Sequence, residues 1–240
     1  MQSENKLGIV VITYNNPDLL DKQIVCLQEF CKDNYELVVI DNSTEQAAID
    51  AVAYKCKING LRMIKTSASS KNGSDSHSFA ANLSYQKLKN DFSHFLYLDH
   101  DCFMVKDFSV MEFLKGKVMA GLGQEKSGIT YFWPGCVMWD NDIVLQCENQ
   151  IDFSPGYGCD TGGMLHMIMR EIKEENLIHF DEQHMQNPGF TKSFYNFFCM
   201  LNKGTFMHFV NGSGWNKENA HEERINSLFN ILTKLCNREV

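Results

Sequence analysis

Apolar runs and helix-patterned segments alternate along the first hundred residues. Four runs are short and lack regular polar alternation, which is typical of buried parallel strands, and they cover residues 7–13, 35–40, 61–65 and 94–98. The segments between them repeat apolar residues at helical spacing, over residues 18–30, 45–54 and 77–88. This order predicts an α/β fold in which a mostly parallel, Rossmann-like sheet is flanked by helices.

The pattern changes after residue 102. Strands are predicted at 118–122, 135–139 and 205–210, and helices are predicted from residue 141 and over 161–174 and 217–236. Residues 153–158 and the stretch from 175 to 188 are expected to be loops. Since no Pro/Gly-rich linker and no repeat divides the sequence, we expect one domain over residues 1–240, with a first half at 1–102 and a second half at 103–240.

Composition and charge narrow the function classes. The 240 residues are 44% hydrophobic and 22% charged, as in a globular protein with a full core, and a formal charge of −8 argues against nucleic acid as a partner. The sequence has no apolar run long enough for a transmembrane segment and no signal-peptide pattern, so we expect a cytoplasmic location. Contact of the amphipathic helix at 217–236 with a membrane surface stays open. Nine cysteines without C-x-x-C spacing indicate reduced thiols.

Polar residues stand where the predicted strands end. Thr13, Asp41 and Asp99 each follow an apolar run. In an open parallel sheet, ligands bind beyond the carboxyl ends of the strands, because the loops converge there. Asp99 and Asp101, one residue apart after the fourth strand, can reach a hard divalent cation that bridges the phosphates of a nucleotide. We therefore predict a metal site at this pair.

A second pair has the same spacing but a different setting. Asp140 and Asp142 precede an apolar segment with helical spacing, where Asp is a common N-cap. We therefore expect a structural role for this pair.

Four motifs carry a resemblance. They are Ile9-Val-Val-Ile-Thr-Tyr-Asn15, Val38-Val-Ile-Asp-Asn-Ser43, Lys71-Asn-Gly-Ser74 followed by Ala81-Asn82, and Phe95-Leu-Tyr-Leu-Asp-His-Asp101. Their order and spacing resemble the family 2 glycosyltransferases of the GT-A fold. The second half is similar more loosely, at Gly135-Cys-Val-Met138 and Tyr157-Gly-Cys-Asp160.

The resemblance implies an activity. It implies a metal-dependent, inverting transfer of a sugar from a nucleotide-diphosphate sugar, with a UDP-sugar as the commonest donor, to a saccharide, lipid-linked or other hydroxyl acceptor, as in polysaccharide biosynthesis. Residues 1–102 would be the half that binds the nucleotide-sugar, and residues 103–240 the half that binds the acceptor.

The resemblance also implies roles for individual residues. The nucleotide would be bound by Thr13, Tyr14, Asn15, Asp41, Asn72, Gly73, His77, Asn82, Asp99 and His100. A Mn²⁺ or Mg²⁺ ion would be held by Asp99, Asp101 and His208. Asp160 would be the base that deprotonates the acceptor hydroxyl. Because aromatic faces suit the C–H faces of pyranoses, the acceptor sugar would stack on one of Trp133, Tyr131, Tyr157 and Trp215.

Two alternative functions stay open. The first is a non-catalytic nucleotide-sugar or saccharide-binding protein, because Cys159 stands where the family has a second carboxylate and His77 where many relatives have an arginine. The second is a sugar-phosphate nucleotidylyltransferase, which should carry a Gly-rich phosphate loop where this chain has Thr13-Tyr-Asn-Asn-Pro17. Structural roles are the alternative at single residues: a turn for Asp41, a helix cap for Asp160, a surface position for His77, a strand residue for His208 and packing for the aromatic residues.

Overall fold

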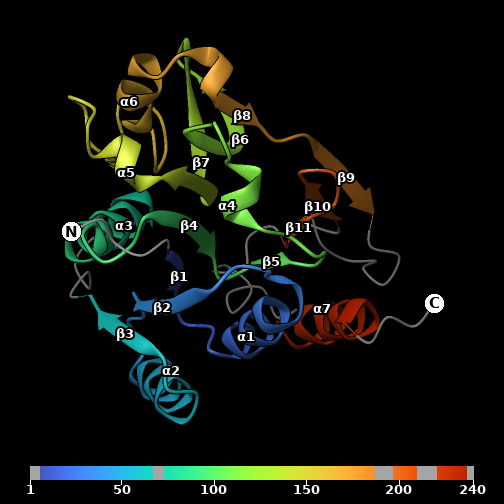
Figure 1. Cartoon of the computed structure of the whole chain (residues 1–240). Helices are drawn as coiled ribbons and strands as arrows, with labels where there is room; N and C mark the ends of the chain where they lie inside the picture. The colour runs from blue at the N-terminus through green and yellow to red at the C-terminus, as the bar shows by residue number, and fades with distance from the viewer. Residues whose placement is uncertain (1–5, 67–72, 187–196, 210–220, 237–240) are drawn as a thin grey trace.

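The computed structural model describes residues 6–66, 73–186, 197–209 and 221–236 (Figure 1). Its larger sheet has seven strands. Their spatial order is β3 (Arg62–Lys65), β2 (Tyr35–Asp41), β1 (Leu7–Thr13), β4 (His94–Asp99), β7 (Ile129–Asp140), β6 (Met119–Lys126) and β8 (Leu177–His179). The strands from β3 to β4 are parallel, and β7 runs antiparallel to both β4 and β6. The predicted mostly parallel α/β sheet is therefore confirmed.

The register of the parallel strands brings their polar ends together. Thr13 is paired with Asp41, and Ile12 is paired with Asp99. All of β1 is buried, as expected for a strand covered on both faces. At Gly8 an added Cβ would lie 2.5 Å from the Phe92 ring, so the strand needs glycine at this close approach. The predicted convergence of Thr13, Asp41 and Asp99 at one edge is thus observed.

Alternate side chains of β1 face different layers. Ile9 and Val11 pack in a cluster with α1 (Asp18–Phe30) and α7 (His221–Cys236), which contact each other on one face (Figure 1). Val10 and Ile12 pack with α3 (Gly73–Leu88) and α6 (Leu165–Glu171). Helix α2 (Gln46–Ile58) lies against β2 and β3. Among the described helices, none has the length and apolar character that a membrane crossing requires.

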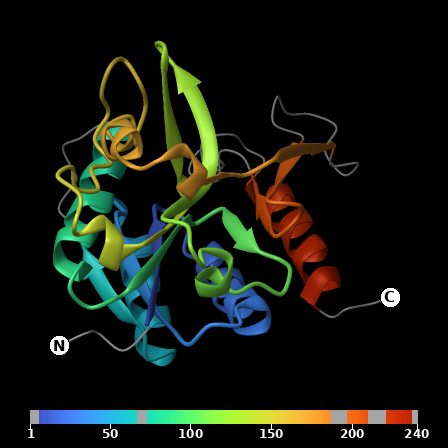
Figure 2. The same ribbon diagram turned by 45° about the horizontal axis from the view of Figure 1, so that its top comes forward.

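A smaller antiparallel sheet adjoins the first. Its order is β5 (Cys102–Met104), β11 (Phe206–His208), β10 (Phe197–Leu201) and β9 (Glu182–Gln186), with α7 close by (Figure 2). The expected loop from 175 to 188 is wrong, because β8 and β9 form within it and a 3₁₀ turn covers Glu174–Asn176. These strands are short, and β9 is stabilised by pairing with β10 rather than by its own apolar residues.

Helix α6 is shorter than predicted. It begins only at Leu165, because Gly162 has φ at +90°, outside the right-handed helical region. The helix expected from residue 141 is the single turn α5 (Asn141–Val144), and a further turn, α4 (Val110–Phe113), was not predicted.

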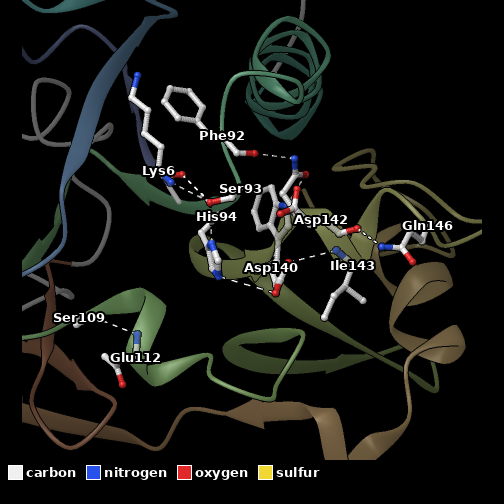
Figure 3. A network of polar contacts seen from close by, with 12 residues as sticks. Lys6, Phe92, Ser93, His94, Ser109, Glu112, Asp140, Asp142, Ile143 and Gln146 are labelled. Atoms are coloured by element: carbon white, nitrogen blue, oxygen red, sulfur yellow. Dashed lines mark hydrogen bonds and ion pairs between the residues drawn. The ribbon is translucent and has the colours of Figure 1, made fainter. Parts of the chain in front are cut away.

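Asp140 lies at the far end of β4 from the converging polar ends. In the register of β4 and β7 it is paired with His94, the first residue of β4. Its side chain accepts a hydrogen bond from the backbone N–H of Ile143 at 3.2 Å and caps α5 (Figure 3). Ser93 directly precedes His94, and its hydroxyl accepts a hydrogen bond from the Lys6 backbone N–H at 2.9 Å. The structural role predicted for Asp140 is therefore confirmed.

Candidate functional site

A cavity of about 460 Å³ opens at the carboxyl ends of β1 and β4. Its wall combines these strand ends with the start of α3, with β7 and with the loop before α6. Of the predicted site residues, it is lined by Tyr14, Gly73, His77, Asp99, His100, Asp101, Trp133 and Asp160. Residues from both halves of the sequence therefore meet around one space.

The turn that carries Asp99 and Asp101 is held from two sides. The fully buried Gln23 of α1 donates from Nε2 to the backbone oxygens of Asp99, at 2.9 Å, and of Cys102, at 2.5 Å. The Tyr14 backbone N–H donates to Nδ1 of His100 at 3.0 Å. Burial lowers the pKa of His100, so its ring is neutral near pH 7 and its proton lies on Nε2. Sequence reasoning missed Gln23, because a polar residue in a helix carries no sign of its tertiary partner.

Asp99 is paired with His77. The His77 Nε2 atom lies 2.8 Å from Asp99 Oδ1, yet it is buried without a well-aligned hydrogen-bond acceptor. Burial opposes both charges, but the attraction between the two groups outweighs it. The pKa of His77 is therefore raised above 6.5, and the pKa of Asp99 is lowered. The pair is a close ion pair whose imidazole N–H points along a poor hydrogen-bond direction.

Asp101 faces a different histidine. Its Oδ1 atom lies 3.7 Å from Nε2 of His208, which is too far for a hydrogen bond. The Phe209 backbone N–H donates to the Asp101 backbone oxygen at 2.8 Å, and this bond fastens the end of β11 to the turn. The Trp133 ring lies against His208, with centroids 4.4 Å apart. His208 does not itself line the cavity; the smaller sheet places it behind Asp101 and Trp133, which do.

Three predicted nucleotide contacts lie at the strand ends without lining the cavity. Asp41 is 1% exposed, and its Oδ1 accepts from the Ser43 backbone N–H at 3.0 Å, while its buried Oδ2 has no hydrogen-bond partner. The Asn15 carboxamide oxygen accepts from backbone N–H groups just before α2. The Thr13 hydroxyl donates to the Ile40 backbone oxygen at 3.3 Å.

The cavity wall at this end is formed by their neighbours. Asn42, Thr44 and Ser76 line it, and none of them was singled out from the sequence. The Asn42 amide donates to the Ser76 hydroxyl at 3.0 Å, which joins the end of β2 to α3. Asn42 lies within the motif Val38–Ser43 and Thr44 directly follows it, and that position is the signal that could have found them.

Asp160 lines the cavity beside the start of α3. Its Oδ1 accepts from the Ser74 hydroxyl and from the Thr161 backbone N–H, and the Thr161 hydroxyl donates back to the Ser74 backbone oxygen at 3.1 Å. Behind it, a Cβ added at Gly163 would lie 2.7 Å from the Cys159 Cβ and 2.9 Å from backbone atoms of Gly156. This close packing sets the position of the Asp160 loop.

The other predicted residues lie elsewhere. The Asn82 side chain binds the loop at 152–154, donating to Asp152 at 2.9 Å and accepting from the Phe153 backbone N–H at 2.8 Å. Tyr157 is 55% exposed and does not line the cavity. Asn72 and Trp215 lie outside the described residues.

Metal-ligand geometry separates two places in the molecule. Asp99, Asp101 and His208 do not form a group of three ligand atoms within 4.8 Å of one another. Within the described part of the chain, the one group that meets this condition is Glu182, His184 and Cys199, in β9 and β10. Sequence reasoning missed this group, since its members come together only through strand pairing.

No family model matches the chain, and no curated protein matches it in sequence. Solved structures do resemble it. A mannosyltransferase from Pyrobaculum calidifontis, in complex with GDP-Man and Mn²⁺, has a TM-score of 0.52 at 14% identity, and the alignment covers 74% of this chain and 55% of that one. The chain therefore spans about half the length of this relative. The likeness shows the GT-A architecture that the motifs predicted.

Two further solved structures are similar to a lesser degree. The galactosyltransferase LgtC, in complex with donor and acceptor sugar analogs, has a TM-score of 0.46 at 12% identity, over 96% of this chain and 95% of that one. TarS residues 1–349 from S. aureus, in complex with UDP, has a TM-score of 0.43 at 16% identity, over 62% and 50%. The family 2 assignment stays a prediction.

Proposed function

We propose that this protein is a glycosyltransferase that moves a sugar from a nucleotide-diphosphate sugar to a hydroxyl acceptor, with a divalent cation and with inversion at the anomeric carbon. One observation carries the proposal. In a GT-A architecture, a single cavity of about 460 Å³ is walled by the Asp99–Asp101 turn from one half of the sequence and by Asp160 from the other. Donor-side and acceptor-side chemistry would thus meet in one space.

Asp101 and His208 would hold the cation. The 3.7 Å between Asp101 Oδ1 and His208 Nε2 can be spanned by two ligand bonds of about 2.1 Å each. A carboxylate oxygen and a neutral imidazole together suit Mn²⁺, and Mg²⁺ is the alternative. When bound there, the ion would neutralise negative charge on a departing diphosphate. Asp99 is engaged by His77 and would act on the ribose or on cation-bound water.

His77 would contact the diphosphate. Its Nε2–H is buried at the cavity wall and lacks a well-aligned acceptor. The attraction of Asp99 raises the pKa of His77 and favours the charged imidazolium. The charged ring, which lines the cavity, would attract the diphosphate electrostatically. His77 would thereby do the work of the arginine that many relatives have.

Asp160 would take the proton of the acceptor hydroxyl. Ser74 and Thr161 both donate to Oδ1 and so orient the carboxylate, and Oδ2 is the oxygen that we assign as proton acceptor. As the acceptor oxygen bonds to the anomeric carbon, the diphosphate leaves from the opposite face. Trp133, which also lines the cavity, would stack on a saccharide acceptor.

Titration calorimetry tests the donor site. UDP and GDP would each be titrated into the wild type and into Asp101→Asn, with and without Mn²⁺. We expect binding of one nucleotide, with UDP the expected one, that requires Mn²⁺ and is lost in Asp101→Asn. Absence of binding under every condition would overturn the proposal.

A non-catalytic binding protein is the second candidate. It is favoured by the side-chain partners that Asp99 and Asp160 already have within the protein. Release of nucleotide diphosphate from a donor sugar in the presence of saccharide acceptors separates the two functions. Nucleotide binding without release would support the binding protein. Release with an inverted anomeric carbon, read by proton NMR of the product, would support the enzyme.

A further inference from the structure

The smaller sheet holds a group of three different metal-ligating side chains outside the cavity. His184 of β9 is directly opposite Cys199 of β10, and Glu182 stands two residues before His184, so all three share one face of the sheet. One ligand atom from each lies within 4.8 Å of the other two. The His184 Nε2 and Glu182 Oε2 atoms are 3.2 Å apart. These three ligand atoms need to move only slightly closer together to bind one ion.

The donor set selects one class of cation. A thiol sulfur, an imidazole nitrogen and a carboxylate oxygen are the three ligand types that Zn²⁺ takes from proteins. The set at Asp101 and His208 has no sulfur and suits harder ions. The two places therefore differ in the ion that each would prefer.

Burial also fits an ion that enters from solvent. The His184 side chain is 60% exposed, whereas Cys199 is 2% exposed and approaches from the core. An ion between them would have protein on one side and an open fourth position on the other, which water can fill. Three protein ligands plus one water occur at zinc sites that keep an open position, whereas closed structural sites have four protein ligands.

We propose that Glu182, His184 and Cys199 form a zinc site that fastens β9 to β10, separate from the proposed glycosyltransferase centre. In the described sheet β9 pairs on one side only, so a bond across to Cys199 would hold an edge strand. Cys199 is also directly opposite His208 of β11. The ion would therefore brace the row of residues that holds His208 beside Asp101.

Cobalt substitution tests the site in the full-length chain. Co²⁺ bound by a thiolate gives a near-ultraviolet charge-transfer band, whereas Co²⁺ bound only by oxygen and nitrogen does not. With excess Mg²⁺ present to occupy the harder site, we expect the band to saturate at one Co²⁺ per chain and to be displaced by one equivalent of Zn²⁺. Absence of the band in the wild type would overturn the proposal.

Two variants test Cys199 and His184 as ligands, and a third variant is the control. Cys199→Ser should abolish the band, and His184→Gln, which changes an exposed side chain, should keep the fold and weaken Zn²⁺ binding by about 100-fold. Cys147→Ser, at a partly exposed cysteine elsewhere, is the matched control and should bind like the wild type. A band that persists in both Cys199→Ser and His184→Gln would place the metal on other cysteines and refute the proposal. Nucleotide binding in His184→Gln tests the glycosyltransferase proposal separately.

Discussion

Asp99 and Asp101 leave the same turn toward two different histidines. His77, from a helix of the first half, lies 2.8 Å from Asp99, and His208, from the smaller sheet, lies 3.7 Å from Asp101. The His77–Asp99 distance is that of a direct ion pair. The His208–Asp101 distance is one at which two ligands of the same cation can lie. Two carboxylates one residue apart therefore have different chemistry, and the difference comes from the elements that face them.

Asp101→Asn should have the largest effect, because it removes the charge from the open pair. We expect Mn²⁺-dependent sugar transfer to fall by about 10³-fold, since an ion at a phosphoryl oxygen contributes several kcal/mol. Steady-state kinetics at saturating donor would measure it. Asp142→Asn, in the pair of equal spacing beyond β7, is the matched control and should keep full activity. Equal losses in both variants would contradict the assignment.

Asp160→Asn should come next. The change keeps the shape of the side chain but removes its basicity, so we expect transfer to fall by about 10²-fold, at the lower end of general-base effects. Donor affinity should stay within about twofold, because the proposed role of Asp160 is to act on the acceptor. Parallel calorimetry and product assays would check this split. A loss of donor affinity equal to the loss of rate would assign Asp160 to the donor site instead.

Gln23→Leu tests whether the turn itself sets the difference between the pairs. The variant leaves the buried carbonyl oxygens of Asp99 and Cys102 without the Gln23 donor, so the free energy of unfolding should fall by about 1–3 kcal/mol. Urea unfolding would measure the fall. Nucleotide affinity should also drop, by about tenfold at temperatures where the variant is folded. Gln46→Leu, on the exposed start of α2, is the control.

The smallest effect that we expect is the change of the free energy of unfolding with pH. The pKa of His77 is raised in the folded protein, so its charged form stabilises the fold fully below about pH 6.5, and this contribution is lost as pH rises through the folded pKa. The pKa of Asp99 is lowered, so its contribution is lost as pH falls through the folded pKa. Urea unfolding with a chelator present should show a steeper decline above neutral pH for the wild type than for His77→Gln. If stability changes with pH in the same way in the wild type and in His77→Gln, the His77–Asp99 pair is not the cause of the decline.

The sequence predicts the two halves of the fold unequally. The strands β1 to β4 were predicted within about a residue at each end, because short apolar runs bounded by turn residues are typical of strands. Strand β9 reads Glu-Gln-His-Met-Gln and has no apolar run. Strand β5 is apolar, but its three residues are too few to indicate a strand. Pairing with distant strands decides both, and local pattern does not contain that information.

The sequence also predicts only part of the candidate site. Motif positions gave the cavity side chains of the Asp99–Asp101 turn and of Asp160, because strand ends and helix starts bring polar residues to one edge. The pairing of His77 with Asp99 and the grip of Gln23 on the turn depend on side-chain positions in three dimensions. Asn82, chosen from the same motifs, is used for a loop contact that no motif indicates.

The packing behind Asp160 bears on how the specificity of this protein could change. At Gly163 even a methyl group would meet backbone atoms of Gly156, and at Gly162 it would lie 2.8 Å from Pro134 with φ at +90°. A random library selected for use of new acceptors should therefore return glycine at both positions. Tyr157, exposed a few residues earlier, should return many side chains. Adaptation to new acceptors would proceed through the outer part of this loop while its base stayed fixed.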